Sequence, residues 1–167
     1  MAKLSVHLVA WNGAKYIPYL FESLRKQTYK DWELIAIDNA SAKDNTADLI
    51  EKELKDFPVT VRFIRNKENN GFAGGHNQAV QMSSAPPLTP PRQGGETKQF
   101  PPLPEGVEDG SSERRPRGLG GVGASEYIQL LNQDMYLAPD YFEKVVAMMD
   151  EHPEAVAGQG LLLKWDF

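Results

Sequence analysis

Cysteine is absent from the 167 residues, which excludes disulfide bonds and every metal site built on thiolates. Long apolar runs are absent too, since none approaches the ~20 residues that a membrane-spanning helix needs. Basic residues are outnumbered, 18 against 23 acidic ones, and form no stripe, which argues against a nucleic-acid partner. The short N-terminal apolar run continues into Trp11-Asn12 instead of a small-residue cleavage site, so no signal peptide is indicated. We therefore expect a cytoplasmic domain without a transmembrane segment.

Proline and glycine are scarce except between residues 83 and 123. That stretch holds 8 of the 12 prolines and 8 of the 14 glycines, and its five basic residues balance its five acidic ones. Such a composition buries too little apolar surface to offset the entropy of ordering, so we predict a disordered insert. An alternative is a ligand for aromatic-lined grooves, because "PPLTPPR" has a PxxP pattern. Residues 1–167 then form a single domain that this insert interrupts.

Apolar runs of strand length alternate with amphipathic helical patterns in the rest of the sequence. Helical spacing begins near Pro18, Leu49 and Phe142, with Thr46 as an expected N-cap, and a short helix is expected around 78–82. Strands are expected at 4–11, 32–38, 59–66 and 126–134, with a fifth at 155–165. This alternation predicts an α/β fold with a mainly parallel central sheet.

Polar residues follow four of these strands at the point where each strand ends. They are Trp11-Asn12, Asp38-Asn39-Ala40-Ser41, the glycine-rich turn at 69–77, and Asn132-Gln133-Asp134. In an open parallel sheet, ligands bind in the crevice beyond the carboxyl ends of the strands. We therefore expect these four segments to form one site.

The first two strand ends carry groups suited to a nucleoside. Trp11 can stack on a planar base while backbone groups near Ala10 read the base edge; the alternative is an aromatic lid on the core. Asp38 can accept hydrogen bonds from a base imide or a ribose hydroxyl; the alternative is a turn former, because "DNAS" is ordinary turn chemistry.

The glycine-rich turn is weaker evidence, because "GFAGG" matches neither a Walker loop nor GxGxxG. Gly71 and Gly75 either let the backbone approach a ligand closely or simply form the turn. His76 and Asn77 follow at the expected start of a helix, where N–H groups favour an anion. We interpret the lone His76 as a structural polar residue.

Asp134 is the best candidate for a metal ligand. A carboxylate at a strand tip can hold a hard divalent cation that also contacts substrate phosphates, and Mg²⁺ or Mn²⁺ usually takes only one or two protein carboxylates. Asn132 and Gln133 flank it with amide oxygens. The alternative is a carboxylate that caps the helix beginning near Pro139, a role for which Asp140 competes.

Together these motifs resemble family 2 glycosyltransferases. "LVAWNGAKYIPYLFESLRKQTYKDWELIAIDNASAKDNT" is similar to the opening of that family, and "RNKENNGFAGGHNQAV" and "YIQLLNQDMYLAPDYFEKVV" look like segments of its bacterial rhamnosyltransferase-like branch. The resemblance implies a three-layer GT-A fold and an inverting enzyme that uses a nucleotide-sugar donor, UDP- or dTDP-linked. It also implies work on a cell-envelope polysaccharide, in the cytoplasm or at the inner face of the plasma membrane.

By position in that family, Trp11 replaces a base-contacting Tyr, Asp38 matches a nucleoside-binding Asp, and Asp134 matches the last residue of a DXD-type motif that holds Mg²⁺ or Mn²⁺. Asn132 replaces the first Asp of that motif. The donor-binding residues that the resemblance implies are Ala10, Trp11, Asn12, Asp38, Asn39, Gly71, Gly75, Asn77, Asn132 and Gln133.

The chain departs from the family in two respects. It carries the insert at 83–123, and the family continues past "LLLKWD" into an acceptor-binding half that supplies the general base. No candidate base is found here, which predicts a donor-binding part truncated at its C-terminus. Alternatives are a non-catalytic nucleotide-sugar-binding module or decayed copy, and a dinucleotide-dependent oxidoreductase, which the lack of GxGxxG after the first strand opposes.

Overall fold

A computed structural model describes residues 2–83 and 125–163. The elements follow in the order β1 (Leu4–Ala10), α1 (Ile17–Arg25), β2 (Trp32–Asp38), α2 (Thr46–Glu53), β3 (Thr60–Arg65), α3 (Gly71–Ser83), β4 (Tyr127–Asn132) and α4 (Tyr141–Glu151). The four strands form one sheet in the order β3-β2-β1-β4, and every neighbouring pair is parallel. The predicted α/β class with a parallel sheet is confirmed.

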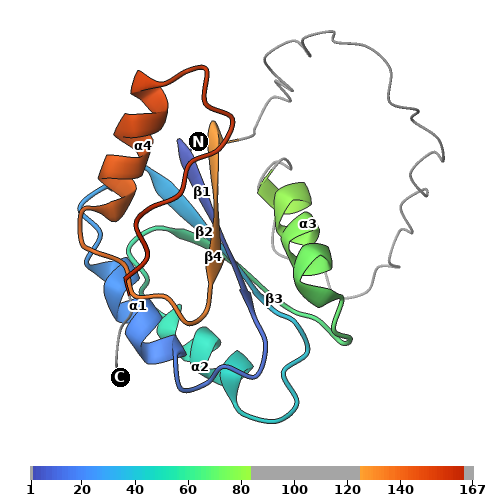
Figure 1. Cartoon of the computed structure of the whole chain (residues 1–167). Coiled ribbons are helices and arrows are strands. Elements are labelled where there is room, and N and C mark those ends of the chain that lie inside the picture. The colour runs from blue at the N-terminus through green and yellow to red at the C-terminus, as the bar shows by residue number, and fades with distance from the viewer. Residues whose placement is uncertain (1, 84–124, 164–167) are drawn as a thin grey trace, which may run out of the picture.

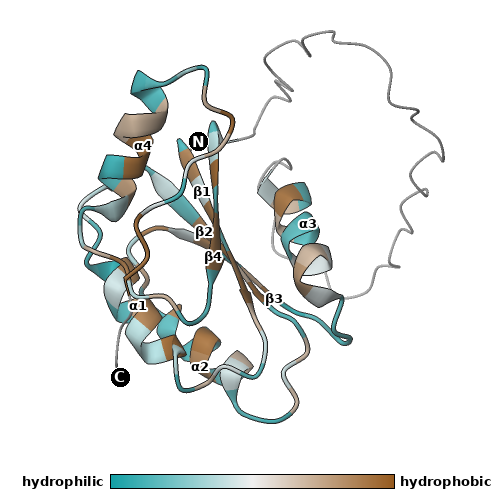
Figure 2. Ribbon diagram, viewed as in Figure 1, coloured by the Kyte–Doolittle hydropathy of each residue, from teal (hydrophilic) through white to brown (hydrophobic). Residues whose placement is uncertain are grey.

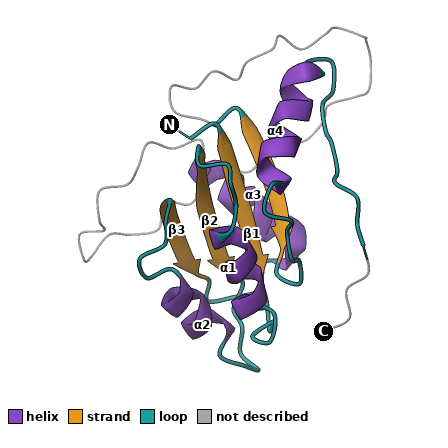
Figure 3. Ribbon diagram, turned by 90° about the vertical axis from the view of Figure 1, so that its left-hand side faces the viewer, coloured by secondary structure: helices purple, strands orange, loops and turns teal. Residues whose placement is uncertain are grey.

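The sheet lies between two layers of helices. Figures 1 and 3 show α1, α2 and α4 on one face and α3 alone on the other. Side chains alternate along β1, so that Leu4, Val6 and Leu8 join the large core under α1, α2 and α4, while Val9 packs with the small core under α3. Figure 2 shows hydrophobic residues along the strands between these layers. Both faces of β1 and β2 are thus buried, as their near-continuous apolar runs predict.

The strand order reverses between β1 and β4. From β1 the chain moves outward to β2 and β3, with α1 and α2 on one face, and α3 then lies on the opposite face before β4 pairs with the other side of β1. Ligands of open parallel sheets bind beyond the carboxyl ends of the strands at such a reversal. The fold therefore places a crevice between the ends of β1 and β4.

Three predictions about secondary structure differ from the structure: a strand, the start of a helix and a helix N-cap. The expected fifth strand at 155–165 is wrong for 155–163, which has no regular structure, and residues 164–165 lie outside the described residues. A Cβ on Gly160 would lie 2.5 Å from Tyr141 Cε2, and one on Gly158 would lie 2.5 Å from Met148 Cε, so the glycines allow the backbone to approach α4 at these two points. Glycine in an apolar run here marks close approach, not a strand.

The helix expected around 78–82 begins at Gly71, so it includes most of the glycine-rich segment that the sequence favours as a turn. Thr46 is also not the N-cap: it is the first residue of α2, and Asn45 occupies the cap position without a side-chain bond. The Thr46 hydroxyl instead accepts from the Gly13 N–H at 2.8 Å and donates to Asp44 Oδ1 at 2.5 Å. It joins the β1–α1 loop to the start of α2.

The predicted disordered insert at 83–123, with its PxxP segment, lies outside the described residues except for Ser83, which ends α3. Within the described ranges, no helix has both the length and the apolar composition to cross a membrane.

Buried polar side chains lie beneath α3. Ser5 Oγ and His7 Nε2 are 3.1 Å apart, Ser5 Oγ donates to Glu33 Oε1 at 3.1 Å, and Glu33 Oε2 lies 3.3 Å from Arg62 Nη2. His7 is fully buried, and its Nδ1 has no partner among the described residues. Burial, with a smaller contribution from the nearby His76, lowers the pKa of His7 from 6.5 to about 4. The folded protein therefore favours the neutral form of the His7 imidazole.

We predict that the free energy of unfolding falls as the pH drops from 6.5 towards 4. In this range the unfolded chain protonates His7 while the folded chain does not, so stability rises with pH. The loss from this residue at pH 4 is on the order of 3 kcal/mol. Urea unfolding at pH 4 to 7 should show a flatter pH dependence for His7→Gln, and the same slope as wild type for the exposed His152→Gln. An unchanged slope in His7→Gln would contradict this account.

Candidate functional site

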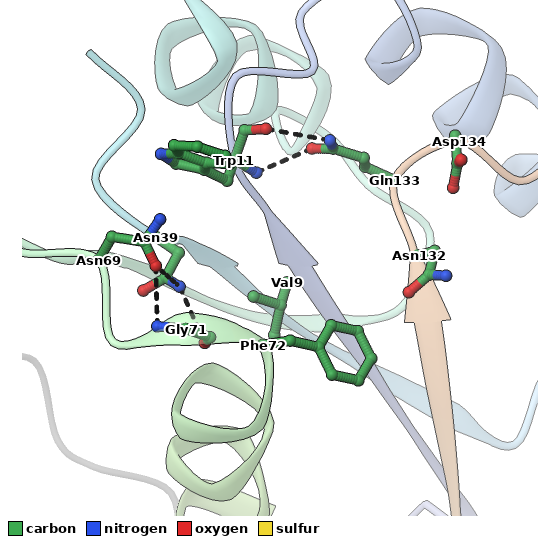
Figure 4. Close-up of a pocket in the computed structure, with 9 residues that line it drawn as sticks. All are labelled: Val9, Trp11, Asn39, Asn69, Gly71, Phe72, Asn132, Gln133 and Asp134. Atoms are coloured by element: carbon green, nitrogen blue, oxygen red, sulfur yellow. Dashed lines mark hydrogen bonds between the residues drawn. The ribbon is translucent and has the colours of Figure 1, made fainter.

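A cavity of about 370 Å³ opens beyond the carboxyl ends of β1, β2 and β4 (Figure 4). Its lining residues are Val9, Trp11, Asn39, Asn69, Gly71, Phe72, Asn132, Gln133 and Asp134. The register of the sheet explains the location, because Val9 pairs with Asn132 and Ala10 pairs with Asp38. Three strands therefore end at the same level, next to the reversal of strand order.

Trp11 extends over this cavity from the end of β1. Its exposed fraction is 48%, which excludes the alternative of an aromatic lid on the core. The backbone of Trp11 is held by one side chain: its N–H donates to Gln133 Oε1 at 2.8 Å, and Gln133 Nε2 donates to its carbonyl oxygen at 3.1 Å. Figure 4 shows this pairing, with the indole pointing away from Gln133.

Two predicted site residues near Trp11 shape the loop instead of lining the cavity. Ala10 is fully buried, and its carbonyl accepts from the Asn39 N–H at 2.8 Å. Asn12 has a positive φ of 47°, which Asn tolerates better than most residues. Its Oδ1 accepts from the backbone N–H groups of Ala42 and Lys43 at 3.1 and 3.0 Å. Asn12 therefore joins the β1–α1 loop to the β2–α2 loop.

Asp38 ends β2 and is almost fully buried. Its Oδ2 accepts from the Ser41 N–H at 3.1 Å, so the turn contact that the sequence suggests does occur. Its Oδ1 is buried without a hydrogen-bond partner in the described part of the chain. A buried carboxylate oxygen left without a donor is costly, which marks this atom as a place where a ligand donor would be favourable.

Asn39 is buried at the rim of the cavity and uses both ends of its amide. Its Nδ2 donates to Asn69 Oδ1 at 2.8 Å and to the Gly71 carbonyl at 3.1 Å. Its Oδ1 accepts from Asn66 Nδ2 and from the Asn70 N–H, both at 3.1 Å. One side chain thus fixes the whole segment between β3 and α3.

Helix α3 begins at the cavity. Gly71 has a positive φ of 72°, which favours glycine, and Phe72 beside it lines the cavity with its ring 61% exposed. Gly75 lies deeper: a Cβ there would lie 2.7 Å from Val9 Cγ1, so its hydrogen lets α3 pack closely on β1. Asn77 is exposed further along the helix.

His76 is not at the start of a helix, as the sequence suggests, but inside α3. It is buried, its ring lies 4.4 Å from that of Phe72, and burial lowers its pKa. The interpretation of His76 as a structural residue agrees with this position, away from the lining of the cavity.

Asn132 and Asp134 are exposed at the end of β4 and line the cavity. The structure places Asp140, not Asp134, at the start of α4, where it pairs with Lys144 at 2.6 Å. Asp134 is the only ionisable residue among the lining residues, and the described residues contain no cluster of three or more potential His, Asp or Glu metal ligands. Any cation here would therefore be held by one carboxylate with neutral oxygens.

Three lining residues were not singled out from the sequence, although two of them lie in the segment 69–77 that was expected to join the site. Val9 reads as an ordinary buried strand residue, and Phe72 and Asn69 fall within a segment that resembles a turn. A signal for Phe72 was present, since it is the one large apolar side chain in the segment 69–77, and a polar, glycine-rich turn offers an aromatic ring little to pack against.

Comparison with known proteins identifies the family and supports the fold. The family model described as "Glycosyl transferase family 2" matches residues 5–88, about half of the chain. The teichoic acid poly(glycerol phosphate) polymerase of Staphylococcus epidermidis is 31% identical over 86 residues, covering 52% of this chain and 12% of that protein. An uncharacterized glycosyltransferase, YfnE, of Bacillus subtilis is 38% identical over 80 residues, covering 47% of this chain and 20% of that protein. The chain thus spans a fifth or less of these relatives.

The crystal structure of S. aureus TarS 1–349 in complex with UDP is similar in fold. It superposes with a TM-score of 0.59 at 20% identity, over 96% of this chain and 38% of that one. The expected three-layer GT-A fold is confirmed by this likeness and by the parallel sheet.

We predict that Asn39→Ala lowers the free energy of unfolding by roughly 2–4 kcal/mol, because it leaves several buried donors and acceptors without partners. Asn77→Ala, an amide lost from an exposed position of α3, should change it by less than about 0.5 kcal/mol. Thermal and urea unfolding of both variants tests this. Equal losses in the two variants would refute the role of Asn39.

Proposed function

Because the chain belongs to glycosyl transferase family 2, we propose that it forms the donor-binding part of an enzyme that transfers a sugar from a nucleoside-diphosphate sugar to an acceptor hydroxyl. The observation that carries the proposal is the cavity at the reversal of strand order, with an exposed indole and a single carboxylate around it. An indole suits a planar base, and a carboxylate suits a cation that accompanies a diphosphate.

The base and ribose would bind near the ends of β1 and β2. The Trp11 indole offers an exposed face for stacking, and Asp38 Oδ1 offers a buried acceptor without a partner in the described residues. An imide N–H or a ribose hydroxyl would satisfy that oxygen with a charge-assisted bond. The carbonyl of Ala10 already accepts from Asn39 and keeps a second lone pair for the base edge. UDP- and dTDP-sugars both carry the imide that this arrangement fits.

The diphosphate would bind near Asp134. The donor set there, an exposed carboxylate with the Asn132 amide close in sequence, fits Mg²⁺ or Mn²⁺, which prefer oxygen ligands and need few from the protein. When bound, such a cation would neutralise charge on the departing nucleoside diphosphate. No basic residue lines the cavity in the described chain, so the proposal assigns this task to the cation. The first turn of α3, which starts at Gly71, adds backbone N–H groups that favour an anion.

Transfer with inversion requires a base that removes the proton of the acceptor hydroxyl. We assign none within the described residues, because Asp134, the one ionisable residue of the lining, is taken by the cation. The lack of an assigned base among the described residues favours a second candidate function, a module that binds a nucleotide-sugar without transferring the sugar. Work on a cell-envelope polysaccharide belongs to the main proposal and is supported by the teichoic acid polymerase among the relatives. A location in the cytoplasm or at the inner face of the plasma membrane is part of the same proposal.

We predict that Asp134→Ala abolishes Mn²⁺-dependent binding of UDP and dTDP, measured by calorimetry with and without MnCl₂, while the unfolding curve stays close to wild type. The exposed carboxylate makes no hydrogen bond or ion pair within the described part of the chain, whereas a cation would lose its only charged ligand. Asp31→Ala is the matched control, because Asp31 is exposed just before β2, at the end of the strands that faces away from the cavity. Unchanged Mn²⁺ dependence in Asp134→Ala would overturn the metal assignment.

A further inference from the structure

The side-chain amide of Gln133 is hydrogen-bonded within the protein. Its carboxamide pairs with both backbone groups of Trp11, accepting from the N–H at 2.8 Å and donating to the carbonyl at 3.1 Å (Figure 4). An amide that pairs with a backbone in this two-point way is fixed in both position and orientation. The sequence implies that Gln133 binds the donor directly, but its side chain is engaged by the protein.

The opposite side of this amide is closely packed. A Cβ built on Gly13 would lie 2.3 Å from both Cδ and Oε1 of Gln133, far inside van der Waals contact. Gly13 has no unusual φ, so the absence of a side chain there serves to make room for Gln133. The β1–α1 loop is therefore shaped around the Gln133 carboxamide.

Few other contacts restrain Trp11 in the described part of the chain. The side chain is 48% exposed, so packing constrains it weakly. The residues that follow are held separately: the Asn12 N–H donates to Ser41 Oγ, and the Gly13 N–H donates to Thr46 Oγ1. Among the described contacts, Gln133 alone binds the polar backbone groups of Trp11.

We propose that Gln133 is a positioning residue of the nucleotide site: it sets the orientation of the Trp11 indole and links it to the turn that carries Asp134. This inference rests on the proposed function and adds a positioning residue to the same site. Gln133 precedes the metal-ligand candidate by one residue and hydrogen-bonds the stacking residue, so the base end and the diphosphate end of the donor are recognised by one connected unit.

The test is a double-mutant cycle on UDP affinity with saturating Mn²⁺. Gln133→Ala should weaken UDP binding about tenfold, the effect expected when one or two net hydrogen bonds no longer order the site. In a Trp11→Ala background the same substitution should change affinity less than about twofold, because its effect passes through the indole. Gln81→Ala, on the exposed side of α3, is the matched control and should bind as wild type does. Losses that multiply in the double variant would mean direct contact with UDP and would overturn the proposal.

A spectroscopic measurement checks the link without nucleotide. Acrylamide quenching of Trp11 emission, taken as the difference between each protein and its Trp11→Phe counterpart, should increase in Gln133→Ala and stay unchanged in Gln81→Ala. Gly13→Ala should reproduce the increase by displacing Gln133, and should add nothing in the Gln133→Ala background. Unchanged quenching in Gln133→Ala would contradict the positioning role.

Different results would overturn the proposed function and the positioning role of Gln133. A folded wild-type chain that binds no UDP with Mn²⁺ would overturn the proposed function, and the positioning role with it. Binding by wild type with an unaltered Gln133→Ala variant would overturn the positioning role and leave the proposed function intact.

Discussion

The parallel pairing of β1 with both β2 and β4 is the constraint on which the rest of the structure depends. Because all three strands run in the same direction, their carboxyl ends meet at one edge, and the register sets Ala10 beside Asp38 and Val9 beside Asn132. The side chains that follow these strands then have to share one region of space. The exposed indole, the buried carboxylate oxygen and the exposed Asp134 come together for this reason, although more than 120 positions separate the first from the last.

The polar residues at this edge divide into two groups by how fully they are bonded. Asn12, Asn39 and Gln133 use their amides on backbone or side-chain partners and fix the loops. Trp11 and Asp134 present exposed side chains, and Asp38 keeps one buried oxygen without a partner in the described residues. Buried polar groups are normally paired, so the bonded group makes a rigid frame and the open group is where a ligand can gain affinity.

The features predicted correctly from the sequence are those that depend on residues close together in the chain. β1 and β2 were found because continuous apolar runs indicate strands buried on both faces, and the strand-end rule then brought Trp11 and Asp134 to one cavity. Prediction from the sequence failed for glycine-containing segments, because residues 71–75 are helical and pack on Val9, and Gly158 and Gly160 lie close to α4 in a segment without regular structure. The sequence could not show which amide side chains are hydrogen-bonded within the protein and which could bind a ligand. Trp11, the hydrogen-bond partner of Gln133, lies 122 residues away in the sequence.

The charge around the cavity indicates which kind of ligand the site could bind. Asp134 is the one ionisable residue that lines the cavity in the described chain, so a diphosphate would meet repulsion there unless a cation came with it. The proposed base end would have the opposite character, because stacking on Trp11 would be neutral and insensitive to the cation. Two such different interactions can cooperate only if their residues are held in a fixed relation. Figure 4 shows the indole on one side of Gln133 and Asp134 on the other, and the two-point amide pairing is the contact that fixes this relation.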